Sequence, residues 1–314
     1  MKFAFVFPGQ GSQSVGMMAA YSATEGDAAV IRDTFAEASN ALGFDLRDML
    51  ANGPADALNQ TVNTQPVMLA AGVAVYRLWL ARGGTPPALM AGHSLGEYSA
   101  LVCAGALDFA DAIRLVRLRA EAMQSAVPEG VGAMAAVLGL DDDGVRAACA
   151  EAAQGEVLEA VNFNSPGQVV IAGNKAAVER GMALAKEKGA KRALPLPVSV
   201  PSHCALMRPA AEKLRVALAA IEVRAPSMPV LHNADVAAHA TADAIRDALA
   251  RQLYSPVRWV ESMFALRDQG VQLIAECGPG KVLAGLNKRT LEGVPTLALA
   301  DAATLADVLE KTKA

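Results

Sequence analysis

The chain has 314 residues, of which 53% are hydrophobic and 19% are charged, and its formal net charge is −4. This composition is typical of a globular protein with a substantial core and excludes a disordered chain. No dense basic run occurs in the sequence, so we expect no nucleic-acid partner.

The apolar runs and the cysteines indicate the cellular compartment in which we expect the protein. The run at 3–7 is too short for a signal peptide, and no run approaches the roughly 18 residues of a membrane span. The cysteines form no C-x-x-C pair and have no histidine at metal-ligand spacing; they are Cys103, Cys149, Cys204 and Cys277. We therefore expect a cytoplasmic protein with no membrane partner, no metal site and buried or incidental thiols.

The first predicted element is a short buried strand at 3–7, followed by a glycine-rich loop at 8–13. Gly9-Gln10-Gly11 starts like a dinucleotide-binding loop, but the next glycine comes at position 16, and no Lys-Ser/Thr pair follows. We expect this loop to present free backbone amides at the end of a strand. Helical patterns follow at 28–42, near 46 and at 65–81.

A second apolar run, 88–92, leads into Gly92-His93-Ser94-Leu95-Gly96, which matches the G-x-S-x-G pattern of a nucleophile elbow. Such a turn exposes the serine at the carboxyl end of a strand, and it points the amide of Leu95, at a helix N-terminus, to where an oxyanion would form. A purely structural turn fits this short pattern equally well.

The next predicted helix, 109–127, carries one charged residue on its apolar face. Alanine, leucine, valine and methionine recur at steps of three and four, and Arg119 falls in that stripe. A buried guanidinium keeps its charge and needs an anionic partner. That partner is either a carboxylate of the chain, in a structural ion pair, or a carboxylate on a substrate.

From position 131 the pattern changes to strands and helices in the order β-α-β-β-α-β, which is typical of a ferredoxin-like unit. The strands are predicted at 131–138, 157–163, 168–172 and 190–196, and the helices at 141–153 and 174–188. We read the acidic residues at 141–143 as charges at a helix start, with no metal. The unit looks like an insert in a parallel α/β sheet.

Further elements follow the insert: a helix at 203–220, a strand at 228–231, helices at 243–253 and 260–269, and a strand at 271–276. The turn at 278–281, Gly-Pro-Gly-Lys, opens one more helix. Glycine and proline are the usual residues of a strand-to-helix turn, so we favour a structural turn over an anion site there.

A serine nucleophile needs a base, and the chain has four histidines. His93 neighbours Ser94, but adjacent side chains in an extended segment point to opposite faces. His232 and His239 lie in segments where a surface position is plausible. His203 is the strongest candidate, because we place it in the first turn of the helix at 203–220, where the helix dipole keeps an imidazole neutral. The alternative is a helix-capping histidine without a catalytic role.

With these residues assembled, the sequence resembles the malonyl-CoA:acyl carrier protein transacylases of bacterial fatty-acid synthesis. Several separate motifs over nearly the whole chain carry the resemblance: FVFPGQGSQ (5–13), GHSLGEY (92–98), LRAEAMQ (118–124), VNFNSPGQ (161–168), PSH (201–203), RQLYSP (251–256) and ECGPGK (276–281). At 277 a cysteine stands where the family has valine, a change of similar volume.

The resemblance implies an α/β-hydrolase-like domain, 1–128 and 198–314, with a ferredoxin-like subdomain at 129–197. It also implies a role for individual residues. Ser94 is expected to be the acylated nucleophile and His203 the general base and acid. The amides of Gln10 and Leu95 would form the oxyanion hole. Arg119 would bind the malonyl carboxylate, and the backbone carbonyl of Gln252 would orient the histidine.

The implied substrates are malonyl-CoA and an acyl carrier protein, with no cofactor, and we expect a monomer. One alternative is a stand-alone acyltransferase that loads a polyketide synthase carrier protein. A plain serine esterase is expected to have an acidic third member of the triad. A non-enzymatic binding domain would leave Ser94 unreactive.

Overall fold

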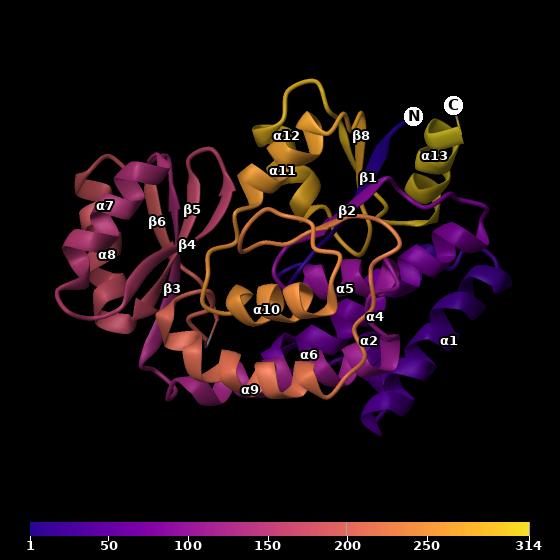
Figure 1. The fold of residues 1–314 in the computed structure, drawn as a ribbon, viewed down its shortest axis with the longest axis horizontal. Coiled ribbons are helices and arrows are strands. Elements are labelled where there is room, and N and C mark those ends of the chain that lie inside the picture. Colours follow the sequence, from indigo (N-terminus) through magenta and orange to yellow (C-terminus); the bar gives the residue numbers. More distant parts are fainter. Residues whose placement is uncertain (199, 314) are drawn as a thin grey trace.

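The strands form two separate sheets (Figure 1). A computed structural model describes residues 1–198 and 200–313. The larger sheet is entirely parallel, as predicted. Its spatial order is β7 (Val230–Leu231), β2 (Leu89–Gly92), β1 (Phe3–Phe7), β8 (Leu273–Glu276) and β9 (Thr296–Ala298).

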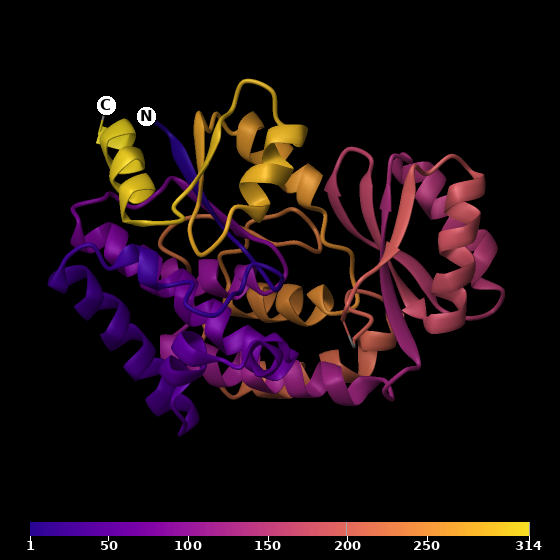
Figure 2. The same cartoon turned by 180° about the vertical axis from the view of Figure 1, so that it is seen from behind.

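Strand β1 is the centre of the larger sheet and is buried on both faces. Phe3, Phe5 and Phe7 point into the main core, while Ala4 and Val6 point into a second core on the opposite face. The main core is covered by α1 (Glu25–Leu42), α4 (Thr61–Ala81), α5 (Gly96–Cys103), α6 (Phe109–Ala126), α9 (Arg208–Ala219), α10 (Ala242–Gln252) and α13 (Ala302–Lys313). The second core lies under α11 (Trp259–Asp268) and α12 (Val282–Thr290) (Figure 2).

Local interactions explain where two of the predicted helices begin. Helix α1 starts before the predicted position 28, because Thr24 and Asp27 form a capping box. Helix α4 starts at Thr61 although it contains Pro66. The proline lacks the N–H that would bind the carbonyl of Val62, and Arg117 Nη1 donates to that carbonyl at 3.1 Å instead. Shorter helices, α2 (Leu46–Asn52) and α3 (Ala55–Asn59), connect α1 to α4.

The smaller sheet is antiparallel, with the spatial order β4-β5-β3-β6. Its elements follow the predicted chain order: β3 (Gly132–Leu138), α7 (Asp142–Ala153), β4 (Leu158–Ser165), β5 (Gln168–Asn174), α8 (Lys175–Glu187) and β6 (Arg192–Pro195). Asp141 accepts a hydrogen bond from the amide of Gly144, so it caps α7 as predicted. Helices α7 and α8 cover one face of this sheet (Figure 1).

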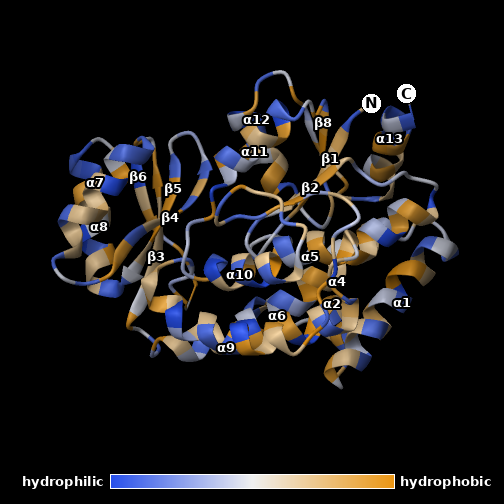
Figure 3. Ribbon diagram, in the orientation of Figure 1, coloured by the Kyte–Doolittle hydropathy of each residue, from blue (hydrophilic) through white to orange (hydrophobic). Residues whose placement is uncertain are grey.

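The two sheets meet where β4 approaches the segment before α11. Phe163 donates its amide to the carbonyl of Val257, and the amide of Val257 donates to the carbonyl of Val161. Arg289 of α12 donates to Gln168 of β5 at 2.8 Å. The strands of both sheets are mostly hydrophobic, whereas the outer helices expose their polar sides (Figure 3). Among the described residues, no helix is both long and apolar enough to span a membrane.

Candidate active site

The segment after β2 forms a tight strand-to-helix turn. Ser94 has a φ of 51°, in the left-handed region. A Cβ on Gly92 would lie 1.9 Å from the carbonyl carbon of Gly96, and a Cβ on Gly96 would lie 2.0 Å from the carbonyl oxygen of Phe7. Both glycines are therefore required by close backbone contact. The amide of His93 donates to the carbonyl of Phe7 at 3.0 Å, which ties the turn to the end of β1.

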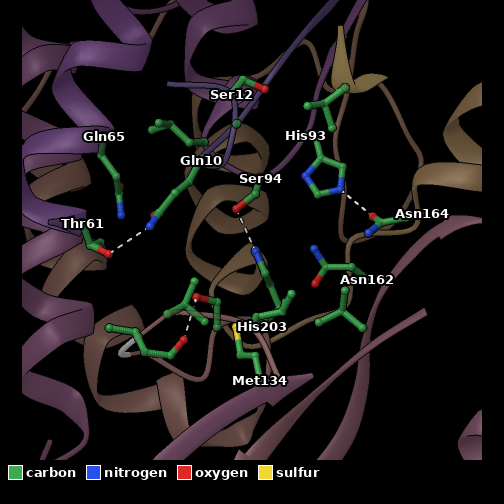
Figure 4. Close-up of a pocket in the computed structure, with 18 of the residues that line it drawn as sticks. Gln10, Ser12, Thr61, Gln65, His93, Ser94, Met134, Asn162, Asn164 and His203 are labelled. Atoms are coloured by element: carbon green, nitrogen blue, oxygen red, sulfur yellow. Dashed lines mark hydrogen bonds between the residues drawn. The ribbon is translucent and has the colours of Figure 1, made fainter. Parts of the chain in front are cut away.

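Ser94 and His203 are in hydrogen-bond contact (Figure 4). The distance from Ser94 Oγ to His203 Nε2 is 2.7 Å, and His203 Nδ1 lies 2.8 Å from the backbone carbonyl oxygen of Gln252. A carbonyl oxygen only accepts, so Nδ1 carries the proton and Nε2 is free to accept the serine hydroxyl. This arrangement can remove a proton from Ser94.

The environment of His203 keeps its ring neutral. Burial, and then the nearby positive charge of Arg119, lower the pKa of His203 from 6.5 to about 3. A base that stays unprotonated is ready to accept a proton at neutral pH.

The expected helix position of His203 is wrong. The 3₁₀ turn Ala205–Met207 and then α9 begin after it, because Pro209 fits only in the first turn of a helix. His203 instead has a φ of 66°, and its amide donates to the carbonyl of Leu253 at 3.0 Å. The helix dipole is therefore not the reason for its neutral ring.

The other histidines have different surroundings. His93 Nε2 lies 2.8 Å from Asn164 Oδ1 (Figure 4) and stays apart from Ser94 Oγ. The expectation of a surface position is wrong for His232, which is fully buried with Nδ1 2.7 Å from Glu97 Oε1. His239 is partly exposed and contacts Asp235.

Arg119 is buried on the predicted face of α6, with 2% of its surface exposed. Its Nη1 donates to Gln65 Oε1 at 2.8 Å, and its Nη2 donates to Gln252 Oε1 at 3.0 Å and to Ser94 Oγ at 3.3 Å. None of the described carboxylates forms a salt bridge with it, so the expected alternative of a structural ion pair is wrong for this part of the chain. Burial lowers the pKa of Arg119, and an anion beside it would offset that cost.

The loop after β1 packs directly on the turn at Ser94. A Cβ on Gly9 would lie 2.5 Å from the carbonyl oxygen of His93 and 3.8 Å from the amide nitrogen of Leu95. The side chain of Gln10 is held by Thr61 at 3.3 Å (Figure 4). Within residues 1–198 and 200–313, the backbone amides of Gln10 and Leu95 donate to no protein group. Two free amides beside a serine are able to stabilise an oxyanion.

A cavity of about 240 Å³ opens at Ser94 and is lined by the segments that follow β1 and β2 and by strands of the smaller sheet. Asn162 and Asn164 of β4 and Gln168 of β5 line one wall, and Leu283 and Leu286 of α12 line another. The motif at 161–168 contains both asparagines, but the sequence assigned neither of them a role. Residues two apart on a strand point to the same face, so this spacing could have indicated that both asparagines line one wall.

The turn after β8 is structural, as favoured from the sequence. Glu276 accepts hydrogen bonds from the amides of Leu283 and Ala284, at 3.1 and 2.8 Å. The chain's own carboxylate thus occupies the N-terminus of α12. No group of three or more His, Cys, Asp or Glu side chains among the described residues is arranged to hold a metal.

Comparison with known proteins places this chain in a family. The family model for the acyl transferase domain matches residues 4–310. The chain belongs to this family. The malonyl CoA-acyl carrier protein transacylase of Escherichia coli K12 is 60% identical over 309 residues, covering 98% of this chain and 99% of the relative. The Bacillus subtilis transacylase is 44% identical, covering 99% and 98%.

Solved structures agree with this assignment. An acyl carrier protein S-malonyltransferase from Vibrio cholerae superposes with a TM-score of 0.95 at 58% identity, covering 98% of this chain and all of the other. A malonyl-transacylase solved with its type II polyketide synthase acyl carrier protein gives a TM-score of 0.96 at 56% identity, covering 99% and 100%. The chain is an acyltransferase of the malonyl-CoA:acyl carrier protein transacylase family.

Proposed function

We propose that the chain moves a malonyl group from malonyl-CoA to the phosphopantetheine thiol of an acyl carrier protein, through an ester on Ser94, and so supplies fatty-acid synthesis. One observation carries the proposal: a serine bound to a neutral histidine lies beside a buried arginine that has no carboxylate partner among the described residues. The first feature suits acyl transfer, and the second suits an acyl group with a free carboxylate.

In the first half-reaction, Ser94 Oγ attacks the thioester carbon while its proton passes to His203 Nε2. The carbonyl oxygen becomes an oxyanion, which the amides of Gln10 and Leu95 stabilise. The intermediate then collapses as the carbon–sulfur bond breaks, and His203 returns its proton to the sulfur of CoA. The product is malonyl-Ser94.

The second half-reaction reverses these roles. The carrier-protein thiol gives its proton to His203 Nε2, and its sulfur attacks the ester carbon. When the carbon–oxygen bond breaks, Ser94 Oγ regains the proton from His203. No redox step or metal is involved, so we infer that malonyl-CoA and the carrier protein are substrates and that the reaction needs no cofactor.

Arg119 gives this site its preference for malonyl. Its Nη2 lies close enough to Ser94 Oγ for the guanidinium to reach a carboxylate attached next to the ester carbonyl. An arginine–carboxylate pair in a buried site is worth several kcal/mol relative to the arginine left without a partner. An acetyl group cannot make this contact.

The backbone carbonyl of Gln252 replaces the acidic member of an esterase triad. This carbonyl fixes the tautomer and orientation of His203, but unlike a carboxylate it places no negative charge beside Nδ1. The buried carboxylate of Glu97 binds His232 rather than His203. This difference supports transfer over plain hydrolysis.

We infer a division into an α/β-hydrolase-like domain, 1–128 and 198–314, and a ferredoxin-like subdomain at 129–197. The range 198–314 includes residues 199 and 314, which lie outside the described part. The separate hydrophobic core of the antiparallel sheet supports this division. We further propose a monomer, and we place it in the cytoplasm because its four cysteines are free thiols.

A transfer assay tests the proposed function. The purified protein is mixed with malonyl-CoA and either a fatty-acid or a polyketide carrier protein bearing phosphopantetheine, and acylated carrier and free CoA are quantified. We expect one malonyl-carrier for each CoA released, with the fatty-acid carrier preferred. Release of CoA without acylated carrier would indicate a hydrolase, and preference for the other carrier would favour polyketide loading.

A further inference from the structure

A buried carboxylate lies directly behind the catalytic serine. Glu97, on the first turn of α5, is fully buried. Its Oε1 lies 2.7 Å from His232 Nδ1, and its Oε2 accepts from the amide of Asn233 at 2.8 Å and from Gln252 Nε2 at 2.9 Å. The proposed mechanism assigns no role to this group. Two N–H groups, from Asn233 and Gln252, and the ring of His232 therefore converge on this one carboxylate.

The side-chain amide of Gln252 has a different neighbour at each end. Its Nε2 donates to Glu97 Oε2 and, at 3.0 Å, to the carbonyl oxygen of Ser94. Its Oε1 accepts from Arg119 Nη2 at 3.0 Å. An amide can rotate by half a turn and exchange its two ends at little steric cost, so its neighbours decide which end faces which side.

We infer that Glu97 is a positioning residue for acyl-group selection, because it holds the Gln252 amide in the one orientation that presents an oxygen to Arg119. In the opposite orientation, the NH₂ group would face the guanidinium, and an oxygen would face both the carboxylate of Glu97 and the carbonyl oxygen of Ser94. All three contacts are repulsive, and of the two acceptors only Glu97 carries a charge. The inference rests on the proposed function, since it explains how Arg119 is held ready for the malonyl carboxylate.

Gln252 separates this role from that of the base. Its backbone oxygen binds His203, whereas its side chain binds Arg119. A change at Glu97 therefore reaches Arg119 through a side chain that His203 does not use. The two effects can be measured separately. Disturbing Arg119 should slow malonyl transfer more than acetyl transfer, whereas disturbing His203 should slow both equally.

A second branch from Glu97 reaches the turn itself. Asn233, whose amide binds Glu97, donates from Nδ2 to the carbonyl of Gly92 at 2.7 Å and accepts at Oδ1 from the amide of Ser94 at 2.7 Å. Disturbing this branch would displace Ser94 and slow transfer of every acyl group. The ratio of malonyl to acetyl transfer, rather than either rate, is therefore the informative quantity.

The test is a double-mutant cycle between Glu97→Gln and Gln252→Met, read as the ratio of kcat/KM for malonyl-CoA to that for acetyl-CoA. Methionine keeps the length of glutamine and the backbone carbonyl, and removes both ends of the amide. We expect each single variant to lower the ratio about tenfold or more, and the double variant to lower it no further than Gln252→Met alone.

Two results of the cycle would overturn the inference. An unchanged ratio in Glu97→Gln, with both rates reduced equally, would mean that Glu97 only supports the fold or the turn. A further drop of the ratio in the double variant would mean that Glu97 acts on Arg119 without Gln252. Failure of the proposed function is distinct from both, because wild-type protein would then carry no malonyl group on Ser94.

If Glu97→Gln fails to fold, wild-type protein still provides a test. NMR of protein labelled with ¹⁵N-glutamine, with Gln252→Met to assign the signal, reports the two Nε2 protons. We expect both to be protected from exchange, because one binds Glu97 and the other binds the Ser94 carbonyl. Exchange as fast as that of an exposed glutamine would overturn the inference.

Discussion

Arg119 Nη2 lies 3.3 Å from Ser94 Oγ, and the remaining hydrogen bonds of this guanidinium go to the neutral side chains of Gln65 and Gln252. A buried positive charge surrounded by neutral acceptors is costly unless an anion joins it. Glu97 acts on this charge only from beyond Gln252, without touching it, and we propose that a substrate carboxylate supplies the missing direct partner.

Replacing Arg119 with alanine tests this relationship. We expect kcat/KM for malonyl-CoA to fall about 100-fold or more, because the substrate carboxylate would be buried without a partner. Acetyl transfer should be kept or increased. The matched control is Arg114→Ala on the same helix, where the arginine is exposed and pairs with Asp111. Equal loss of malonyl and acetyl transfer in Arg119→Ala would show a structural role.

The glycines of the turn are expected to be indispensable for the fold. In Gly92→Ala, the new Cβ would lie 1.9 Å from backbone atoms, and we expect a loss of about 3 kcal/mol or more in the free energy of unfolding. Gly285→Ala in α12 is the control, since a Cβ there meets nothing within 4 Å. That variant should gain about 0.5 to 1 kcal/mol from helix propensity. Chemical denaturation measures both, and similar values for the two variants would contradict the geometry of the turn.

The pH dependence of transfer should reflect the low pKa of His203. Because that pKa is lowered from 6.5 to about 3, the ring stays neutral as the pH falls through 6.5. We expect the acid limb of kcat/KM for release of CoA to lie below about pH 5. A midpoint near 6.5 would show that the ring is exposed to solvent.

The same shift affects stability with a definite sign. The unfolded chain takes up a proton at His203 near pH 6.5, whereas the folded protein resists doing so until about pH 3. Stability from this residue is therefore present above 6.5 and is lost as the pH falls between these values. Relative to His203→Asn, wild-type protein should lose stability across this interval. If the difference in free energy of unfolding between wild-type protein and His203→Asn is the same at pH 7 and pH 4.5, the shift is contradicted.

The cysteines should take no part in transfer. Burial raises the pKa of Cys149 and of Cys204 to about 12, and it raises those of Cys103 and Cys277 well above their usual value. Thiols in this state are poor nucleophiles. We expect iodoacetamide at neutral pH to leave activity unchanged. Mass spectrometry measures the extent of alkylation, and unfolded protein serves as the positive control. Rapid inactivation with labelling of Cys204, beside His203, would argue for a thiol at the site.

Local patterns predicted much of this site. The spacing of the glycines around Ser94 indicated the turn, and the apolar stripe on α6 indicated that Arg119 is buried. Both features depend on residues close in sequence. The parallel sheet then explains why the loop at Gln10 meets the turn at Ser94, since β1 and β2 are neighbours with Phe7 opposite Gly92.

Contacts between distant segments were beyond sequence reasoning. The sequence allowed a surface position for His232, because nothing near it in sequence reveals that Glu97 lies 2.7 Å away. The helix at His203 was misplaced for a similar reason: the bond from its amide to Leu253 replaces the helical start that its local sequence suggests. The orientation of Gln252 likewise depends on Glu97 and Arg119, two residues from other helices.

The most direct test of the account is the intact mass of the protein after brief incubation with malonyl-CoA and no carrier protein. We predict an increase of one malonyl group in wild-type protein, no increase in Ser94→Ala, and loss of the added mass when carrier protein with its phosphopantetheine thiol is supplied. Wild-type protein without the added mass, or an adduct that persists in Ser94→Ala, would contradict the account.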